Sequence, residues 1–203
     1  MNYDIGIIGG GASGMSCALM LASGTEKIEG LKNLKIALFD TGWSDINSAI
    51  FKNVLGLPYG IDGKEAFQKM REQLKHYPAI ELIEKQVLEI DETINNFILK
   101  LKSGEEYSSK KLVLATGLKV FVTKGLDVDI IDHPKVPKKG RLYIKHDDFK
   151  IRENLYVTGA LSGFSTQFPI AIGTGAQTAI NILNELNGSP VVVHDKPERG
   201  PKK

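Results

Sequence analysis

Ile5-Gly6-Ile7-Ile8-Gly9-Gly10-Gly11-Ala12-Ser13-Gly14 is the stretch that decides the fold of this 203-residue chain. Its residues 5–8 form the short apolar run typical of a buried parallel strand. The pattern Gly-x-Gly-x-x-Gly follows at Gly9, Gly11 and Gly14. After a strand, these glycines permit a tight turn, let the backbone approach a pyrophosphate and let a helix pack closely on the strand. The stretch therefore predicts a dinucleotide-binding unit.

Residues 13–40 complete this unit. After Ser13, a plausible helix cap, apolar residues recur at helical spacing, residues 26–33 read as a polar loop, and residues 35–40 form a second strand that ends at Asp40. A strand–helix–strand unit of this length is a right-handed crossover. We expect a pyrophosphate at the helix N-terminus, beside Ala12 and Ser13, where free N–H groups and the helix dipole favour negative charge. Asp40 is then placed to accept hydrogen bonds from the ribose hydroxyls of adenosine.

The remaining pattern predicts an α/β fold: a Rossmann-like domain with a central parallel sheet and an antiparallel β-meander. Residues 41–63 read as irregular, 64–76 as a helix, 80–90, 95–101 and 111–115 as the strands of the meander, 154–157 as a strand, and 173–187 as a helix that stops at Gly188. Residues 118–140 read as a connector. We expect a single domain over residues 1–190 and a disordered tail over residues 191–203.

Composition excludes several classes of protein. A net charge of +2 is too small to indicate binding to nucleic acid or to an anionic membrane. The one cysteine, Cys17, cannot form an intrachain disulfide. No signal peptide precedes residue 4, and no apolar run approaches the roughly 20 residues of a membrane helix. The four histidines lie far apart and do not predict a metal site. These features favour the cytoplasm.

From residue 4 onward the chain resembles the FAD-binding half of the thioredoxin reductase family of pyridine nucleotide-disulfide oxidoreductases. Besides the glycine loop, the resemblance rests on Gln167 and on the stretches 53–58, 61–63, 112–117, 154–160 and 173–176. It covers residues 4–117 and 140–188.

This resemblance implies FAD as the cofactor and assigns several roles. Thr116 and Gly117 would lie against the cofactor, Gly159 and Ala160 at its ribityl and pyrophosphate region, and Gln167 with Phe168 near the flavin ring. A helix N-terminus aimed at the flavin would stabilise negative charge on the reduced ring. Two further matches are Asn53, in the irregular stretch, and Val87, whose backbone would contact adenine. The family also suggests a homodimer.

Three departures from the family pattern separate this chain from a complete reductase. Residues 118–140 stand where the family carries an NADPH-binding domain with its own glycine loop. The family's redox Cys-x-x-Cys belongs to that missing part, and Cys17 reads as a buried, inert thiol. The acidic residue of the family's late Gly-Asp turn is Ala160 here, which predicts a weaker ribityl or phosphate contact.

The leading hypothesis is a single-domain FAD oxidoreductase or electron-transfer protein that is reduced by an external donor: a free nicotinamide, a ferredoxin or a partner subunit. The cofactor carries the redox chemistry, so no catalytic side chain is assigned. The alternative is a non-catalytic flavin-binding subunit or redox sensor that docks a partner through the basic segment 135–145, which otherwise reads as a solvated connector. A third possibility is an NAD-dependent enzyme that uses the single glycine loop.

Overall fold

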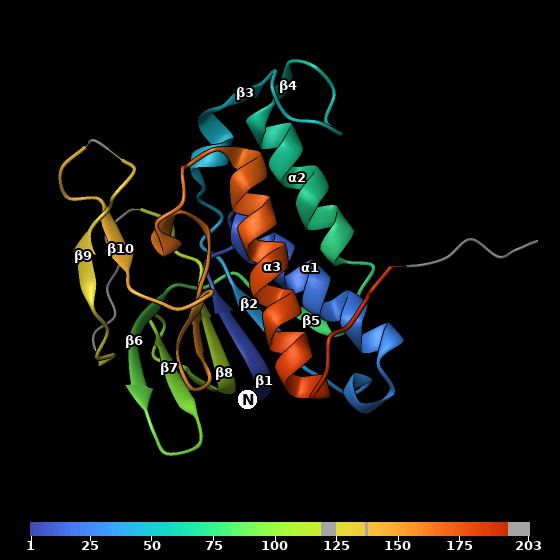
Figure 1. Cartoon of the computed structure of the whole chain (residues 1–203), viewed down its shortest axis with the longest axis vertical. Helices are drawn as coiled ribbons and strands as arrows, with labels where there is room; N and C mark the ends of the chain where they lie inside the picture. Colours follow the sequence, from blue (N-terminus) through green and yellow to red (C-terminus); the bar gives the residue numbers. More distant parts are fainter. Residues whose placement is uncertain (119–124, 137, 195–203) are drawn as a thin grey trace, which may run out of the picture.

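The computed structural model describes residues 1–118, 125–136 and 138–194. Its main sheet has the order β11-β12-β8-β1-β2-β5, and β6 and β7 join it through β8 (Figure 1). The strands are β1 (Asn2–Ile8), β2 (Ile36–Phe39), β5 (Ile80–Ile83), β6 (Val87–Glu92), β7 (Phe97–Leu101), β8 (Glu106–Leu114), β11 (Lys150–Arg152) and β12 (Leu155–Val157). Strands β12, β8, β1, β2 and β5 run parallel to one another. The predicted α/β fold with a mostly parallel sheet is confirmed.

The predicted crossover consists of β1, α1 (Ala12–Lys27) and β2. Its helix is longer than expected and takes in part of the predicted loop, which also holds the 3-10 turn η1 (Glu29–Leu31). The prediction that Ser13 caps this helix is wrong. The N-cap is Gly11, which offers no side chain, and Ser13 lies buried in the first turn.

Two apolar cores cover the two faces of the sheet. The helices α1, α2 (Gly63–Leu74) and α3 (Phe168–Asn187) lie together on one face (Figure 1). There they pack on Ile5 and Ile7 of β1 and on Val113 of β8. The meander covers the opposite face, where Leu99 of β7 packs with Leu112 of β8. Because both faces are buried, the parallel strands read as continuous apolar runs rather than as alternating ones.

The meander is antiparallel, as expected, and returns to the parallel sheet through β8. The predicted single strand over residues 80–90 is wrong. Its first part, β5, pairs parallel with β2, and only β6 belongs to the meander. Both pieces are apolar and close in sequence, so periodicity alone gives no sign that they pair with different neighbours.

Three further segments differ from the expectation. The connector 118–140 contains β9 (Ile130–Asp132), which pairs with β10 (Leu142–Ile144), while residues 119–124 and 137 lie outside the described residues. The irregular stretch 41–63 holds the 3-10 turn η2 (Asp45–Ser48) and a small hairpin of β3 (Ile50–Phe51) and β4 (Ile61–Asp62). In the segment expected to be disordered, Val193 is buried in the helix-side core, and residues 195–203 lie outside the described residues.

Helix α3 begins five residues before the expected start at Gly173. Pro169 stands in its first turn, where a missing N–H costs nothing. Gly175 lowers the helix propensity of this segment but is required by packing, because a Cβ there would lie 2.1 Å from the carbonyl oxygen of Ser13. The predicted stop at Gly188 is confirmed, with φ +72°.

Two smaller observations bear on function. Cys17 is completely buried in α1, and burial raises the pKa of its thiol, so it does not act as a reactive thiolate. Within the described residues, no helix is both long enough and apolar enough to cross a membrane.

Candidate functional site

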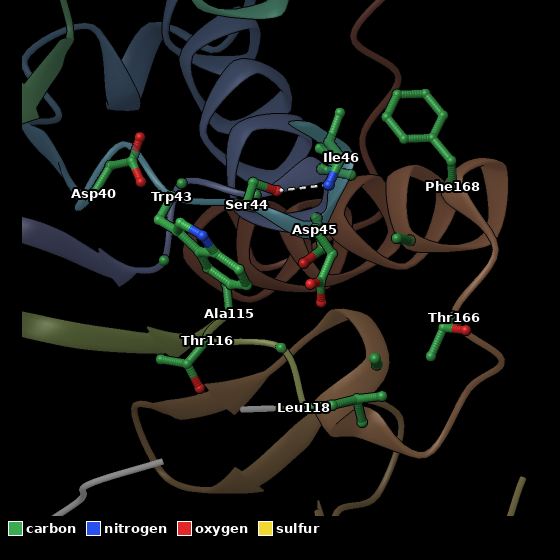
Figure 2. Close-up of a pocket in the computed structure, with 18 of the residues that line it drawn as sticks. Asp40, Trp43, Ser44, Asp45, Ile46, Ala115, Thr116, Leu118, Thr166 and Phe168 are labelled. Atoms are coloured by element: carbon green, nitrogen blue, oxygen red, sulfur yellow. Dashed lines mark hydrogen bonds between the residues drawn. The ribbon is translucent and has the colours of Figure 1, made fainter. Parts of the chain in front are cut away.

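A cavity of about 890 Å³ opens at the carboxyl ends of the parallel strands, which is where open α/β sheets bind their ligands. All of the predicted cofactor residues line it except Gly14 and Gly159. Those that do are Gly9, Gly11, Ala12, Ser13, Asp40, Asn53, Val87, Thr116, Gly117, Ala160, Gln167 and Phe168. Figure 2 shows part of this wall, with Asp40 on one side and Phe168 on the other. Residues more than 150 positions apart in the chain thus meet in one cavity.

The glycines of the loop are needed for different reasons. Gly9 has φ +111°, and a Cβ on Gly14 would lie 1.8 Å from the carbonyl oxygen of Gly9. Both are therefore required by the protein's own packing. Gly11 has ordinary extended backbone, and a Cβ on it would meet only the Ser44 hydroxyl at 3.7 Å. Among the residues that the structure describes, none requires a glycine at position 11, so its missing side chain leaves space for a ligand over the helix.

Two helix N-termini open into this cavity. Gly11, the N-cap of α1, and Gln167, the N-cap of α3, both line it, and neither provides a side-chain hydrogen bond to its helix. Neither helix has an acidic residue in its first turn. First-turn N–H groups that no side chain caps attract anions, and the helix dipole adds to the attraction. The cavity is thus suited to a ligand that carries negative charge at more than one place.

Asp40 is buried at the end of β2 and accepts two hydrogen bonds. Its Oδ1 accepts a hydrogen bond from the Gly42 N–H at 3.1 Å, and its Oδ2 accepts one from Arg71 of α2 at 3.1 Å. A Cβ on Gly10 would lie 2.4 Å from the Asp40 Cγ, so the glycine loop packs directly on this carboxyl. Burial raises the pKa of Asp40, while the Gly42 N–H and the Arg71 charge oppose the rise. Each carboxylate oxygen can accept a further hydrogen bond from a ligand hydroxyl.

Thr116 and Gly117 follow β8 and form the opposite wall of the cavity. The Thr116 Oγ1 is buried and has no hydrogen-bond partner among the described residues. A buried hydroxyl without a partner costs free energy, which a bound ligand would recover. Gly117 has φ +70°, and a Cβ there would meet nothing within 4 Å. A glycine at position 117 therefore permits the left-handed backbone turn, and it leaves the cavity wall open.

The late turn, η3 (Gly159–Ser162), brings the end of β12 to the cavity. Gly159 has φ +72° and faces protein rather than the cavity, since a Cβ there would lie 2.4 Å from the Ser13 Oγ. Ala160, its neighbour, does line the cavity. The Ala160 carbonyl accepts a hydrogen bond from the His133 Nε2, at 2.9 Å, and the His133 Nδ1 accepts one from the Lys135 N–H. The segment before β10 therefore fixes this turn.

The other predicted residues lie along the edges of the cavity. Asn53 and Gln167 are exposed, whereas Phe168 is buried, with its ring centroid 4.5 Å from that of Phe51. Val87 begins β6 at a β-bulge, in which Leu88 is the extra residue against β7. Bulges of this kind often re-aim a strand next to a functional site.

Several lining residues escaped sequence-based prediction. Trp43, Ser44, Asp45 and Ile46 line the cavity from the segment after β2, and Lys138 and Arg141 line it from the segment between β9 and β10. The only tryptophan of the chain, three residues after Asp40, was an available signal. The interpretation of the basic segment 135–145 as a solvated connector is wrong for Arg141, whose Nη1 donates a hydrogen bond to the Leu118 carbonyl at 3.2 Å.

The cavity wall offers several kinds of binding group. Within the described part of the chain, no group of three or more His, Cys, Asp or Glu residues is arranged to hold a metal ion. The cavity wall presents backbone amides, carboxylates, hydroxyls and apolar surface. This arrangement can position an anionic, nucleotide-like ligand, and the chemistry would come from the ligand.

Comparison with known proteins finds relatives by sequence and by fold. The chain is 26% identical over 203 residues to a ferredoxin–NADP reductase of Ligilactobacillus salivarius, covering 95% of this chain and 52% of that protein. A second ferredoxin–NADP reductase, from Lactiplantibacillus plantarum, is 28% identical over 127 residues, covering 63% and 38%. The chain therefore spans about half the length, or less, of these relatives.

Solved structures support the fold. A thioredoxin reductase of Gloeobacter violaceus superposes with a TM-score of 0.72 at 15% identity, covering 98% of this chain and 99% of that one. A ferredoxin-flavin thioredoxin reductase of Clostridium acetobutylicum gives a TM-score of 0.66 at 17% identity, covering 93% and 98%. The family model described as pyridine nucleotide-disulphide oxidoreductase matches residues 3–160, which is more than half of the chain. The chain therefore belongs to the pyridine nucleotide-disulphide oxidoreductase family.

Proposed function

We propose that this protein holds FAD in the cavity and works as an oxidoreductase or electron-transfer protein. The observation that carries the proposal is the convergence of two uncapped helix N-termini and the open space at Gly11 on one cavity bounded by Asp40. The donor set fits FAD: amides for a pyrophosphate, a fixed carboxylate for ribose hydroxyls, and the partnerless Thr116 hydroxyl.

Within this proposal, each group has a distinct task. The first turn of α1 would hold the pyrophosphate, and Asp40 would hold the adenosine ribose. The N-terminus of α3, at Gln167 and Phe168, would place positive potential beside the flavin and favour its reduced, more negative form. Bound FAD would supply hydride or single-electron transfer, while the protein's part is binding and tuning.

We further propose that residues 1–190 form the FAD-binding unit and that residues 118–140 take the place of a nicotinamide-binding domain. The electron donor would then be a separate molecule. The names of the relatives include ferredoxin and NADP, which makes a reduced ferredoxin or a free nicotinamide the first donors to test. A cytoplasmic location and a homodimer remain part of the proposal.

The proposal is tested by the absorbance spectrum of the purified chain, before and after incubation with FAD, followed by anaerobic reduction. We expect flavin bands at about one FAD per chain. Bleaching by NADH or NADPH would identify a free nicotinamide as the donor, and bleaching by dithionite alone would indicate a protein donor. Colourless protein that takes up no added FAD would refute the proposal.

Asp40→Asn tests the adenosine end of the site. Loss of the carboxylate charge should weaken FAD binding by about 10-fold or more, because hydrogen bonds to charged groups are worth roughly 1.5–3 kcal/mol. Calorimetric titration with FAD and with FMN, which lacks adenosine, measures the effect. FMN affinity should stay the same.

Asp4→Asn is the matched control for this substitution. Asp4 also pairs with a cation, Lys110, but it lies near the start of β1, at the other end of the strand from the cavity. An equal loss of affinity in both variants would contradict a specific role for Asp40.

A further inference from the structure

Trp43 is the most unusual group in the cavity wall. It is the only tryptophan in the chain, it is 55% exposed, and it lines the cavity. In Figure 2 its indole projects into the cavity from the side of Asp40, in the direction of Ala115 and Thr116. A large aromatic surface that faces a cavity instead of the core is a common mark of a binding site.

Trp43 follows the end of β2, which lies beside the end of β5 in the cavity wall. The Asp40 N–H donates to the Ile83 carbonyl at 3.0 Å, so the end of β2 lies beside the end of β5. Residues 85–87 follow β5 directly, and Val87 and Ile90 of β6 line the cavity together with Phe39 of β2. The end of β2, with Asp40 and then Trp43, thus lies beside a wall that holds the polar Lys85 and Gln86 as well as the aliphatic Val87 and Ile90.

This combination matches the chemistry of an adenosine group. The flat, weakly polar purine stacks favourably on an aromatic ring, and the ribose carries two hydroxyls that a carboxylate accepts. We propose that Trp43 is a specificity-determining residue whose indole stacks on the adenine ring, next to the ribose held by Asp40. The inference rests on the proposed function and adds to it the group that distinguishes adenine dinucleotides from flavin mononucleotide.

The single tryptophan makes the inference directly testable. When the flavin-free full chain is excited at the red edge of the protein absorbance, where its six tyrosines absorb little, the fluorescence reports on Trp43 alone. Titration with AMP, which carries no flavin, should change this fluorescence in a saturable way. Ribose 5-phosphate, which lacks the base, should leave it unchanged. An AMP titration with no change in fluorescence would overturn the inference.

Variants provide the second measurement. Trp43→Ala should weaken the binding of ADP and FAD by about 5- to 150-fold, the range found when a base loses an aromatic stacking partner. Trp43→Phe should retain most of the affinity, because a smaller ring still stacks. Tyr59→Ala is the matched control, since Tyr59 is 81% exposed but does not line the cavity.

The failure of this inference can be told apart from failure of the proposed function. If the wild-type chain takes up FAD and Trp43→Ala binds ADP and FAD just as tightly, only the role of Trp43 is refuted. If the wild-type chain takes up no FAD, the proposed function is refuted. The AMP titration then still decides whether Trp43 contacts adenine.

Discussion

Gly11→Asp is expected to weaken FAD binding by at least about 100-fold while the protein stays folded. Aspartate is a favoured N-cap residue, and a Cβ at position 11 meets only the Ser44 hydroxyl at 3.7 Å. The new carboxylate would stand where the pyrophosphate is expected. Two like charges about 4 Å apart near a protein surface repel by about 4 kcal/mol, which is more than a 100-fold loss.

Gly14→Ala is the matching substitution, and it is expected to disturb the fold rather than the ligand directly. Its Cβ would lie 1.8 Å from the carbonyl oxygen of Gly9, so α1 would have to move away from β1. We expect a loss of more than about 3 kcal/mol in the free energy of unfolding, with FAD binding lost as a consequence.

Urea denaturation and FAD absorbance, measured on both variants, separate the two effects. If Gly11→Asp binds FAD like the wild type, the cofactor does not lie on α1. If Gly14→Ala unfolds at the wild-type urea concentration, the close contact between helix and strand is not required.

Glu185→Gln is expected to destabilise the protein by about 2 kcal/mol at neutral pH. Glu185 stands near the C-terminus of α3, where the helix dipole disfavours a negative charge. It is compensated by Lys111, Lys150 and the hydroxyl of Tyr156. The Lys111 side chain is only 9% exposed, so the substitution leaves a buried ammonium without the negative charge of Glu185. Partial exposure of Glu185 keeps the expected loss below that of a fully buried pair.

The effect should depend on pH. Burial alone would raise the pKa of Glu185, but hydrogen bonds from Lys111, Lys150 and Tyr156 outweigh it and lower the pKa to about 2. A carboxyl with a lowered pKa stabilises the fold above its unfolded pKa, near 4.5, and loses this contribution as the pH falls toward 2. The difference in unfolding free energy between wild type and Glu185→Gln should therefore fall by roughly half between about pH 7 and pH 3.

Glu153→Gln provides the control, since Glu153 pairs with the same Lys150 but its side chain is 73% exposed. This variant should lose less than about 0.5 kcal/mol at neutral pH. A Glu185→Gln effect that is equal at both pH values would show that the charge of Glu185 does not contribute.

Local sequence signals predicted the strand–loop–helix–strand framework of residues 2–39 well. The glycine loop, the apolar run before it and Asp40 are close in sequence, and their spacing is set by the βα turn itself. Prediction was poorer where two local patterns looked alike. The strand over residues 80–90 was taken as one because an apolar stretch does not show which neighbour it pairs with.

The start of α3 was misplaced because Pro169 and Gly173 both disfavour a helix by propensity. Pro169 nevertheless stands in the first turn of α3, where its missing N–H costs nothing. The roles of Arg141 and His133 were equally invisible in the sequence. Arg141 donates a hydrogen bond to the Leu118 carbonyl, and His133 donates one to the Ala160 carbonyl. Both carbonyls belong to turns that are distant in the sequence. Such contacts arise only when separate segments fold together.

For this protein, the sequence alone determined that a glycine loop joins the first strand to the first helix, because backbone sterics make Gly9 and Gly14 necessary within a few residues. Only the tertiary structure decided which glycines serve the fold and which one leaves space for a ligand, since Gly11 and Gly14 differ in their neighbours and not in their pattern. The tertiary structure also brought Trp43, Arg141 and the α3 N-terminus to the same cavity as the loop. Long-range packing is what turns a local glycine loop into a site.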